Sequence, residues 1–383
     1  MHAWRRSVTA AMTLGLLSGM MAGTAAAQAD GQISYSSQPD RLAVFLNNVA
    51  YAEDAVSLPG GVDMQVMLPD TVVADTLILR EDGARVPDYR LDRSTGRTAL
   101  QWRSSSDSAL REVTLEYLLS GVSWRPRYDM WLGADTDETV ELDFYAEIQD
   151  GSLTLDDVET QLVAGFVDLT SVIDPAATLS VNQALAGYED TAAPRPTLPA
   201  GQVDIQHVYD IGRVTAEPGD VVYTEIVGGT LPARRLHLWN ASTDQQVTVI
   251  YKVENDSEQP LAEGVVRTYQ GGLFIGSDYI ERTPIGSEGS VTVGHLQDVR
   301  VLREESQTLI NEGRFSYLVE VELTISNFTP ETIHLEVVDH RRAEAEEMQF
   351  SIAPQQETGN VMRWVTSVKP DDEMVIRYEY KVD

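Results

Sequence analysis

The residues best suited to chemistry stand in one short segment, "SGVSWRPRYDMWL", which covers residues 120–132. It carries Arg125 and Arg127 two positions apart, followed by Asp129. A guanidinium group binds a carboxylate or a phosphate through paired hydrogen bonds, so the two arginines could hold an anionic ligand. In that interpretation the segment forms the floor of a binding site.

The same segment also has the composition of a bend between two β-strands. Gly121 allows a backbone conformation or close approach that other residues resist, and Pro126 has no N–H to donate to a neighbouring strand. Arg127 and Asp129 would then pair at the rim of the bend. Large aromatic side chains would fix the bend onto a core: Trp124, Tyr128 and Trp131. Every residue type has a structural reason, and the sequence therefore favours the bend.

Histidine is the next candidate for catalysis or metal binding. The histidines that follow the N-terminal segment are His207, His237, His295, His334 and His340. His334 and His340 share one face of an expected strand, but their spacing in the sequence places them ~20 Å apart. One metal ion cannot bind both residues, and the sequence predicts isolated surface histidines.

Clusters of carboxylates occur at residues 135–138, 156–157 and 371–373. Two carboxylates that face each other across a cleft can hydrolyse a glycoside. Because the chain has 60 Asp and Glu residues, such pairs also arise by chance, and we interpret them as a solvated acidic surface. The stretch "DGSLTLDDVE" from Asp150 has oxygen-bearing side chains at alternate positions. It lacks the glycine at the sixth position and the spaced acids of a calcium loop.

Motifs for catalysis or cofactor binding are absent from the sequence. The chain has no cysteine, no Gly-x-Ser-x-Gly element, no His-Glu-x-x-His element and no P-loop. We therefore predict no catalytic residue, no bound cofactor and no metal site. The Asn-x-Ser/Thr sequences at Asn240, Asn255 and Asn327 indicate turns, because an Asn side chain hydrogen-bonds the backbone two residues further on.

Alternation of apolar and polar residues identifies the elements that position these side chains. In "VELDFYAEIQ", residues 140–149, the apolar residues at even positions face inward, whereas Glu141, Asp143 and Glu147 face water. The same period recurs in residues 111–119, 315–326 and 374–383, and only residues 339–350 could form a helical turn or two. The sequence predicts an all-β fold of antiparallel β-sandwich domains, with one solvated face per sheet.

Two stretches share one plan, in which a strand is followed by Asn-x-Ser/Thr, a proline and a second strand. They are residues 251–270 and 321–340, and residues 146–163 follow the same plan without the proline. Strand–corner–strand units at this spacing build β-sandwiches.

The spacing of these units suggests a division into domains. We expect an N-terminal β domain at 30–112, a central β-sandwich at 113–300 and an immunoglobulin-like β-sandwich at 301–383. Residues 173–202 are rich in Ala, Pro and Thr and show no periodicity, which predicts a long mobile loop within the central domain.

The N-terminus has the parts of a secretory signal peptide. Arg5 and Arg6 precede an apolar run of about a dozen residues, which is too short to span a bilayer as a helix. Cleavage near Ala27 or Ala29 would remove residues 1–29. We therefore expect a periplasmic or extracellular protein without a transmembrane anchor, in which ATP- or NAD-dependent chemistry is not expected.

The net charge limits the partners of the protein. The chain has a formal net charge of −32, and loss of the two arginines of the signal segment would make it −34. Such a surface repels nucleic acid and anionic lipid headgroups. Lysine occurs only at Lys252, Lys369 and Lys381, and an acidic, lysine-poor surface suits a salty medium that screens self-repulsion. Two interpretations of this composition remain open: the protein is adapted to high salt, or it is an ordinary acidic periplasmic protein.

Several ordered blocks resemble a known family. "YLLSGVSWRPRYDMWL" and "FYAEIQDGSLTLDDVETQLVAG" are similar to the Trp-x-Pro-x-Tyr-Asp element and the strand–turn–strand that follows it in domain-of-unknown-function family 4139, which includes mucoidy-inhibitor-like bacterial envelope proteins. Residues 264–304 and 319–339 are similar to later blocks, so that the resemblance covers Val113–Asp383. It implies a β-rich fold and an envelope location, and it transfers no catalytic residue.

The chain departs from this family in two places. Leu155 stands near the position where many members have a tryptophan, and the coiled-coil hairpin of the mucoidy-inhibitor-like members is replaced by the short stretch "RSSSDSALR" at residues 103–111. No function that depends on the coiled coil can therefore be inferred.

The function predicted from these observations is non-catalytic. We expect an exported structural or protein-interaction module of the bacterial cell envelope, whose partner is another envelope or periplasmic protein. The alternative is an exported hydrolase acting on a glycan or peptide, with carboxylates brought together by the fold. A deep pocket with two carboxylates, or an acid beside His207 or His295, would favour the hydrolase.

Overall fold

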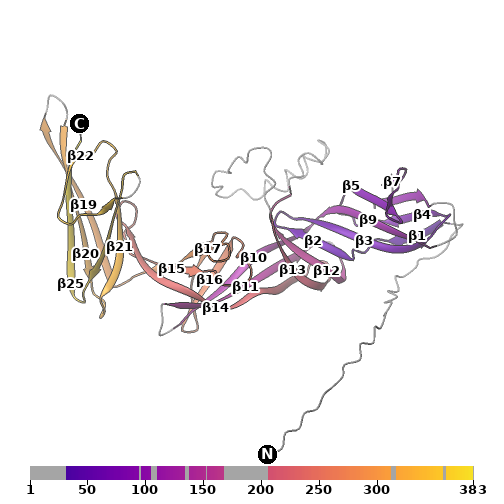
Figure 1. Cartoon of the computed structure of the whole chain (residues 1–383), viewed down its shortest axis with the longest axis horizontal. Helices are drawn as coiled ribbons and strands as arrows, with labels where there is room; N and C mark the ends of the chain where they lie inside the picture. The colour runs from indigo at the N-terminus through magenta and orange to yellow at the C-terminus, as the bar shows by residue number, and fades with distance from the viewer. Residues whose placement is uncertain are drawn as a thin grey trace, which may run out of the picture. The chain divides into compact units, whose positions relative to one another are not determined.

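A computed structural model describes residues 32–94, 96–104, 110–133, 138–151, 153–167, 206–311, 316–356 and 359–382 (Figure 1). All regular structure in these residues is β-strand, most of it paired antiparallel, and none of it is helix. The predicted all-β fold of antiparallel β-sandwich sheets is confirmed. The expected signal peptide at 1–29 and the expected loop at 173–202 lie outside the described residues.

The chain divides into two compact units. Unit 1 comprises residues 1–37, 56–70 and 79–114, and unit 2 comprises residues 38–55, 71–78 and 115–383. The three-domain division expected from the sequence remains a prediction.

Unit 1 contains a four-stranded sheet in the order β1-β4-β8-β7. Alternate residues of its inner strands are buried: Met64, Val66, Leu100 and Trp102. β1 runs parallel to β4, and the other neighbours are antiparallel. The bounds are β1 (Gln32–Ser36), β4 (Asp63–Met67), β8 (Ala99–Arg103) and β7 (Arg90–Asp92).

A seven-stranded sheet has the order β13-β12-β2-β3-β9-β5-β6. Its strands are β13 (His207–Ala216), β12 (Leu155–Ala164), β2 (Arg41–Phe45), β3 (Val49–Pro59), β9 (Leu110–Ser120), β5 (Val72–Glu81) and β6 (Ala84–Arg85). The alternation in residues 111–119 is confirmed, because the side chains predicted to face the core are all buried: Val113, Leu115, Tyr117 and Leu119.

A ten-stranded sheet contains the Trp-x-Pro-x-Tyr-Asp segment. Its main path is β17 (Leu273–Ile280), β16 (Gly264–Gln270), β10 (Val122–Leu132), β11 (Thr139–Asp150), β14 (Val221–Asn240), β21 (Ile333–His340), β24 (Val361–Val368) and β23 (Gln355–Gln356). β15 (Thr248–Glu254) pairs with β14 and with β18 (Glu288–His295). β14 is 20 residues long and pairs with β11 through its first half and with β15 and β21 through its second.

The bend predicted within residues 120–132 is present at Gly121, but its expected extension through Pro126 was wrong. The change of direction is confined to Gly121, with φ of 96°, and residues 122–132 form the continuous strand β10. Pro126 is compatible with an inner strand because the parallel pairing with β16 begins one residue later, at Arg127 opposite Val265. A Cβ added at Gly264 would lie 2.7 Å from the Cβ of Pro126, so the glycine lets β16 approach the proline ring.

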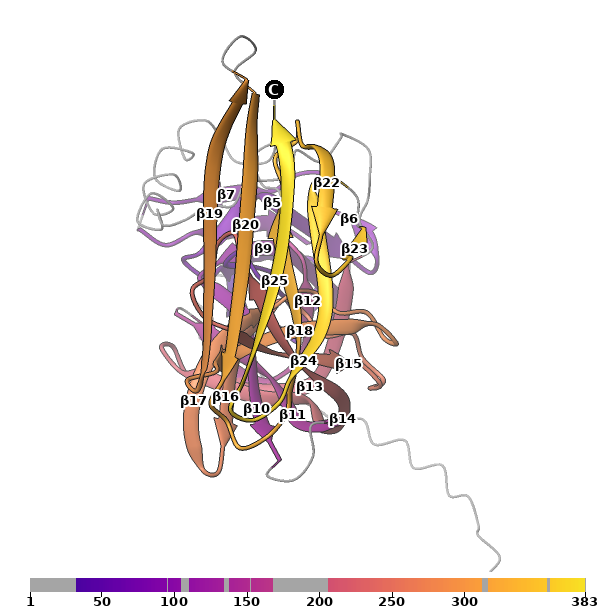
Figure 2. The same cartoon turned by 90° about the vertical axis from the view of Figure 1, so that its left-hand side faces the viewer.

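The C-terminal part of unit 2 is a β-sandwich (Figure 2). One of its sheets is four-stranded, and the other contains β21 and β24. Residues 339–350, where a helical turn was allowed, form the end of β21, a turn and β22. The four-stranded sheet has the order β19 (Val299–Asn311), β20 (Ser316–Asn327), β25 (Asp372–Val382) and β22 (Glu346–Phe350).

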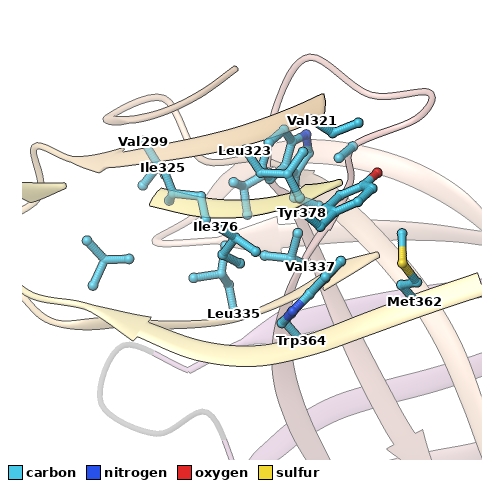
Figure 3. Close-up of a cluster of buried hydrophobic side chains, with 14 of the residues drawn as sticks. Val299, Val321, Leu323, Ile325, Leu335, Val337, Met362, Trp364, Ile376 and Tyr378 are labelled. Atoms are coloured by element: carbon cyan, nitrogen blue, oxygen red, sulfur yellow. The ribbon is translucent and has the colours of Figure 1, made fainter. Parts of the chain in front are cut away.

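Apolar side chains of the two sheets meet in one core (Figure 3). β20 and β25 contribute every second residue, as the alternation predicted, and β21 and β24 supply the facing layer. Burial of this area is the main favourable term in folding such a sandwich. Figure 3 labels Val321, Leu323, Ile325, Ile376 and Tyr378 from the first sheet and Leu335, Val337, Met362 and Trp364 from the second.

The repeated strand–corner–strand plan appears as two copies of one hydrogen-bond network. In the first copy, the buried Asn255 donates from Nδ2 to the carbonyl oxygens of Gln259 and Thr283, each at 3.0 Å. Its Oδ1 accepts from the hydroxyl of Ser257 at 2.7 Å, and that Ser257 oxygen also lies 2.8 Å from the Gln259 carbonyl. One side chain thereby joins a turn to a neighbouring segment.

Asn327 forms the second copy of this corner. Its Nδ2 donates to the carbonyl oxygens of Glu331 and Val368 at 2.8 and 2.9 Å, and its Oδ1 accepts from the hydroxyl of Thr329 at 2.7 Å. Both amide hydrogens are thus bonded inside the fold. The geometry agrees with the interpretation of these two Asn-x-Ser/Thr sequences as turns rather than as attachment points for glycans.

Candidate functional site

The outer face of β10 and its neighbours carries the polar half of the Trp-x-Pro-x-Tyr-Asp segment. Trp124, Tyr128 and Met130 point into the core, so that the alternate residues of β10 point away from it. The strand register places side chains of β11, β14, β16 and β17 beside them. We call this surface the aromatic–arginine face; it comprises Arg125, Arg127, Asp129, Trp131, Tyr145, Glu147, Tyr223, Val265, Arg267, Tyr269, Phe274 and Tyr279.

Arg267 and Asp129 form the central ion pair of this face. Nε of Arg267 donates to Oδ1 of Asp129 at 2.6 Å, and Nη2 donates to Oδ2 at 2.5 Å. Such two-pronged pairing fixes the plane of the guanidinium group. Arg127, the partner expected from the sequence, is more distant, and its Nη2 lies 4.0 Å from Oδ2 of Asp129. The guanidinium carbon of Arg127 lies 5.1 Å from the ring centroid of Tyr223.

Arg125 pairs with Glu147 on β11. Nε and Nη2 of Arg125 donate to the same Glu147 oxygen, at 2.9 and 2.5 Å. The Arg125 side chain is 62% exposed, whereas that of Glu147 is 10% exposed, so the guanidinium group lies outside and the carboxylate beneath it. The expectation that Glu147 faces water was wrong, because this ion pair compensates for the burial of its charge.

Aromatic rings extend the face toward the end of the β16–β17 hairpin. Trp131 and Tyr269 stack with their centroids 5.6 Å apart, and Tyr269 meets Phe274 edge-on at 5.7 Å. Phe274, Tyr223 and Tyr279 are each more than half exposed. Partial burial, followed by the proximity of Glu263, raises the pKa of Tyr279 above that of an ordinary phenol.

A second polar cluster lies inside the C-terminal sandwich, around Asp339 of β21. This carboxylate is fully buried and accepts hydrogen bonds from Nε of Arg303 at 2.9 Å and from the hydroxyls of Tyr378 and Ser242, each at 2.6 Å. The backbone N–H of His340 adds a further bond at 2.8 Å. The cluster joins β21 to β19, β25 and the turn after β14.

Ser242, Asp339 and His340 are the residue types of a hydrolytic triad, but their arrangement is not catalytic. The hydroxyl of Ser242 lies 2.6 Å from Oδ1 of Asp339 and 3.1 Å from Nδ1 of His340, and its single proton is best accepted by the charged carboxylate. A triad needs the histidine to take that proton. Asp339 is in turn neutralised by Arg303.

Electrostatics of the Asp339 cluster agree with a structural role. Burial alone would lower the pKa of Arg303, but the charge of Asp339 and the hydrogen bonds to Glu305 and Asp339 together outweigh it, and the pKa is raised. Burial, followed by the charge of Asp339, raises the pKa of Tyr378. The pKa of Glu305 is lowered although burial opposes this, because Arg303 and Gln307 donate hydrogen bonds to its carboxylate.

The predicted histidines have neutral partners. Nε2 of His207 lies 3.0 Å from Oε1 of Gln259, Nδ1 of His237 lies 3.0 Å from the carbonyl oxygen of His334, and Nδ1 of His295 lies 3.4 Å from Oγ1 of Thr248. Neither His207 nor His295 has an acidic hydrogen-bond partner in the part of the chain that the structure describes. In those residues no three potential metal ligands lie together.

The acidic stretches singled out from the sequence are separated by the fold. Asp157 pairs with Arg213 at 2.9 Å on an exposed edge, and Asp371, with φ of 54°, lies in the turn before β25. The buried Asp150 accepts the N–H of Leu153 at 2.9 Å and thereby closes a turn. Residues 135–137 lie outside the described residues.

The class of protein that these features define is an all-β sandwich protein with polar networks at its surface and in its core. No family model and no curated protein matches the chain. Within the described residues there is no helix with the length and apolarity to cross a membrane.

Sequence reasoning singled out the segment that carries Arg125, Arg127 and Asp129, although it predicted a bend there, and it missed Arg267, the partner that fixes Asp129. Arg267 lies 138 residues further along the chain, and only the parallel pairing of β10 with β16 brings the two together. The alternation Val265, Arg267, Tyr269, beside Val266 and Thr268, was the available signal that an arginine and two other large side chains share one face.

Proposed function

We propose that the chain is an exported, non-catalytic β-sandwich module of the bacterial cell envelope that binds another envelope or periplasmic protein. Export is supported by the signal-like segment at residues 1–29, and the envelope role by the resemblance of residues 113–383 to domain-of-unknown-function family 4139. The contact surface that we propose is the aromatic–arginine face.

The observation that carries this proposal is the composition and order of that face. Tyr, Trp and Arg are the residues that most often dominate the binding energy of protein interfaces. Arg125 and Arg267 are already oriented by Glu147 and Asp129, so that little side-chain entropy remains to be lost on contact. An exposed sheet surface with these properties supports recognition of a folded partner.

A site-specific photo-cross-linker tests the proposed surface. Placed at Tyr223, which is 53% exposed on β14 at one margin of the face, it should give a discrete adduct in the intact envelope. The matched control is a cross-linker at Val365, which is 64% exposed on β24, outside the face. Identical adducts from both positions, or no adduct from Tyr223, would contradict the proposal.

A second experiment tests export independently of binding. The mature protein should be recovered from the periplasm or the medium with an N-terminus that follows Ala27 or Ala29. A full-length chain confined to the cytoplasm would refute the proposed location without bearing on the binding surface.

The hydrolase remains a second candidate because one hollow of about 750 Å³ collects several glutamates on the outer face of the β19-β20-β25-β22 sheet. It is an open depression rather than a deep cleft. A hydrolase would cleave a glycan or peptide substrate, and Glu320→Gln would abolish that cleavage. If the purified mature protein cleaves cell-wall glycan or peptide and this variant does not, the non-catalytic proposal is wrong.

A further inference from the structure

Figure 2 shows the four strands of the β19-β20-β25-β22 sheet side by side. The hollow in the outer face of this sheet is a second candidate binding surface. Its floor is the backbone of a single row of paired residues, in which Glu305, Val321, Tyr378 and Phe350 lie side by side and Val321 and Tyr378 point into the core. The walls are the outward side chains on either side of that row. We call this surface the β19 hollow; its walls include Glu304, Ser306, Glu320, Glu322, Arg377 and Glu379.

The strand register places like charges directly opposite each other in the β19 hollow. Glu304 of β19 is paired with Glu322 of β20, and Glu320 of β20 is paired with Glu379 of β25. Like charges at directly opposed positions destabilise a sheet. Arg377 relieves one member, because its Nε donates to Glu322 at 2.7 Å. The fold therefore retains an arrangement that works against its own stability.

Among the residues that the structure describes, the other three glutamates have no cation of their own. Within the described residues, no ion pair is formed by Glu304, Glu320 or Glu379, and Glu320 only accepts a long hydrogen bond of 3.5 Å from Ser306. The chain as a whole carries a net charge of −32. The surface is thus complementary to a positively charged partner and repels an anionic one.

Two further features of this surface favour a polypeptide over a small cation as its ligand. β19 pairs only with β20, so one of its edges is open along its length, and Leu302, on the same outer face, is 53% exposed. An open strand edge and an exposed apolar side chain both suit an added strand. Glu320 and Glu322 are two positions apart on β20, so the two opposed pairs are displaced by about 7 Å along the strands, which is the spacing of alternate side chains in an extended chain, and by one strand across the sheet.

We propose that the β19 hollow binds an extended segment of a partner protein that carries basic residues at alternate positions. Its basic side chains face the unpaired glutamates, and an aliphatic side chain covers Leu302. This surface is separate from the aromatic–arginine face and does not depend on the function proposed for that face.

Fluorescence anisotropy of the mature protein with a labelled ten-residue peptide of alternating lysine and serine tests this site. The variant Glu304→Gln, Glu320→Gln, Glu379→Gln should weaken binding at least tenfold in ~0.15 M salt. The matched control is Glu258→Gln, Glu281→Gln, Glu331→Gln, which removes the same charge from exposed positions elsewhere and should change binding less than twofold. An equal loss in both variants would mean that the peptide senses only the overall charge, and would overturn the proposal.

Thermal unfolding of the same variants distinguishes a role of these glutamates in binding from a role in stabilising the fold. Neutralising the opposed glutamates should leave Tm unchanged or raise it while peptide binding is lost, because repulsion is removed. A variant that loses binding and unfolds at a clearly lower temperature would instead show that the glutamates serve the fold. Unchanged binding after addition of millimolar Mg²⁺ is expected, and displacement of the peptide by Mg²⁺ would overturn the proposal in favour of a metal site.

Discussion

Two carboxylate–arginine pairs in unit 2 have the same chemistry but opposite surroundings. Asp339 lies between the sheets of the C-terminal sandwich, where it is fully buried. It accepts hydrogen bonds from Arg303 and Tyr378 on two other strands and from Ser242 in a turn. Asp129 with Arg267 lies on the outer face of the central sheet and joins two adjacent strands only. An aspartate–arginine pair thus holds two sheets together in the sandwich core, whereas a pair of the same residue types orients a surface arginine on the central sheet.

The contrast predicts the largest effect for loss of the buried carboxylate. Asp339→Ala should reduce the free energy of unfolding by about 3–5 kcal/mol, because it removes the buried acceptor shared by Arg303, Tyr378 and Ser242 and leaves Arg303 with Glu305 alone. Urea unfolding followed by tryptophan fluorescence measures this change. Asp372→Ala, at the exposed first residue of β25, is the control and should stay within about 0.5 kcal/mol. A loss of similar size in both variants would remove the distinction between the regions.

The repeated asparagine corners offer an intermediate test. Asn255→Ala and Asn327→Ala should each lower the free energy of unfolding by about 2 kcal/mol, because each removes two hydrogen bonds from the side chain to backbone carbonyl oxygens. Similar losses at the two sites would support a common structural unit. Asn240→Ala should cost less, since the Asn240 side chain accepts only a long bond of 3.3 Å from the N–H of Ser242.

The strands and the asparagine turns could be predicted from the sequence, but the two ion pairs could not. The reason is the distance along the chain between the residues that interact. Alternation in residues 140–149 and 315–326 is a local signal, and so is the Asn-x-Ser/Thr turn, in which the side chain bonds its own backbone. Neither Asp129 nor Asp339 could be assigned a partner in the same way. Arg267 and Arg303 are 138 and 36 residues away, and sheet order alone decides which strands become neighbours.

Pro126 shows how a local rule failed. A proline without an N–H suggested an edge or a bend, yet it lies in the inner strand β10 because β16 begins to pair only beyond it. The information needed to see this lies at Gly264, whose missing side chain allows the close approach of the two strands. Two residues that are far apart in the sequence had to be considered together.

The surface pair should matter less for stability than for binding. Asp129→Ala should lower the free energy of unfolding by only about 1 kcal/mol, since the Arg267 side chain is 30% exposed and water can solvate its charge. It should nevertheless abolish the cross-link from Tyr223, because Arg267 loses its fixed orientation. Quantitative blotting of the adduct measures the second effect. A variant that loses several kcal/mol while keeping the cross-link would reverse the roles that we assign to the two pairs.

The smallest effect that separates the regions is a pH dependence. Glu305 has a lowered pKa in the folded state, so its contribution to stability is fully present above the ordinary glutamate pKa of about 4.3 and is lost as the pH falls through the folded value. Glu305→Gln should therefore flatten the fall in stability below about pH 4.3 by a few tenths of a kcal/mol, measured by urea unfolding at several pH values. Glu258→Gln, at an exposed position in the turn after β15, should leave the slope unchanged. If Glu305→Gln does not flatten the slope, the acid sensitivity of the sandwich comes from other carboxylates, and Glu305 does not support Arg303 in holding the two sheets together.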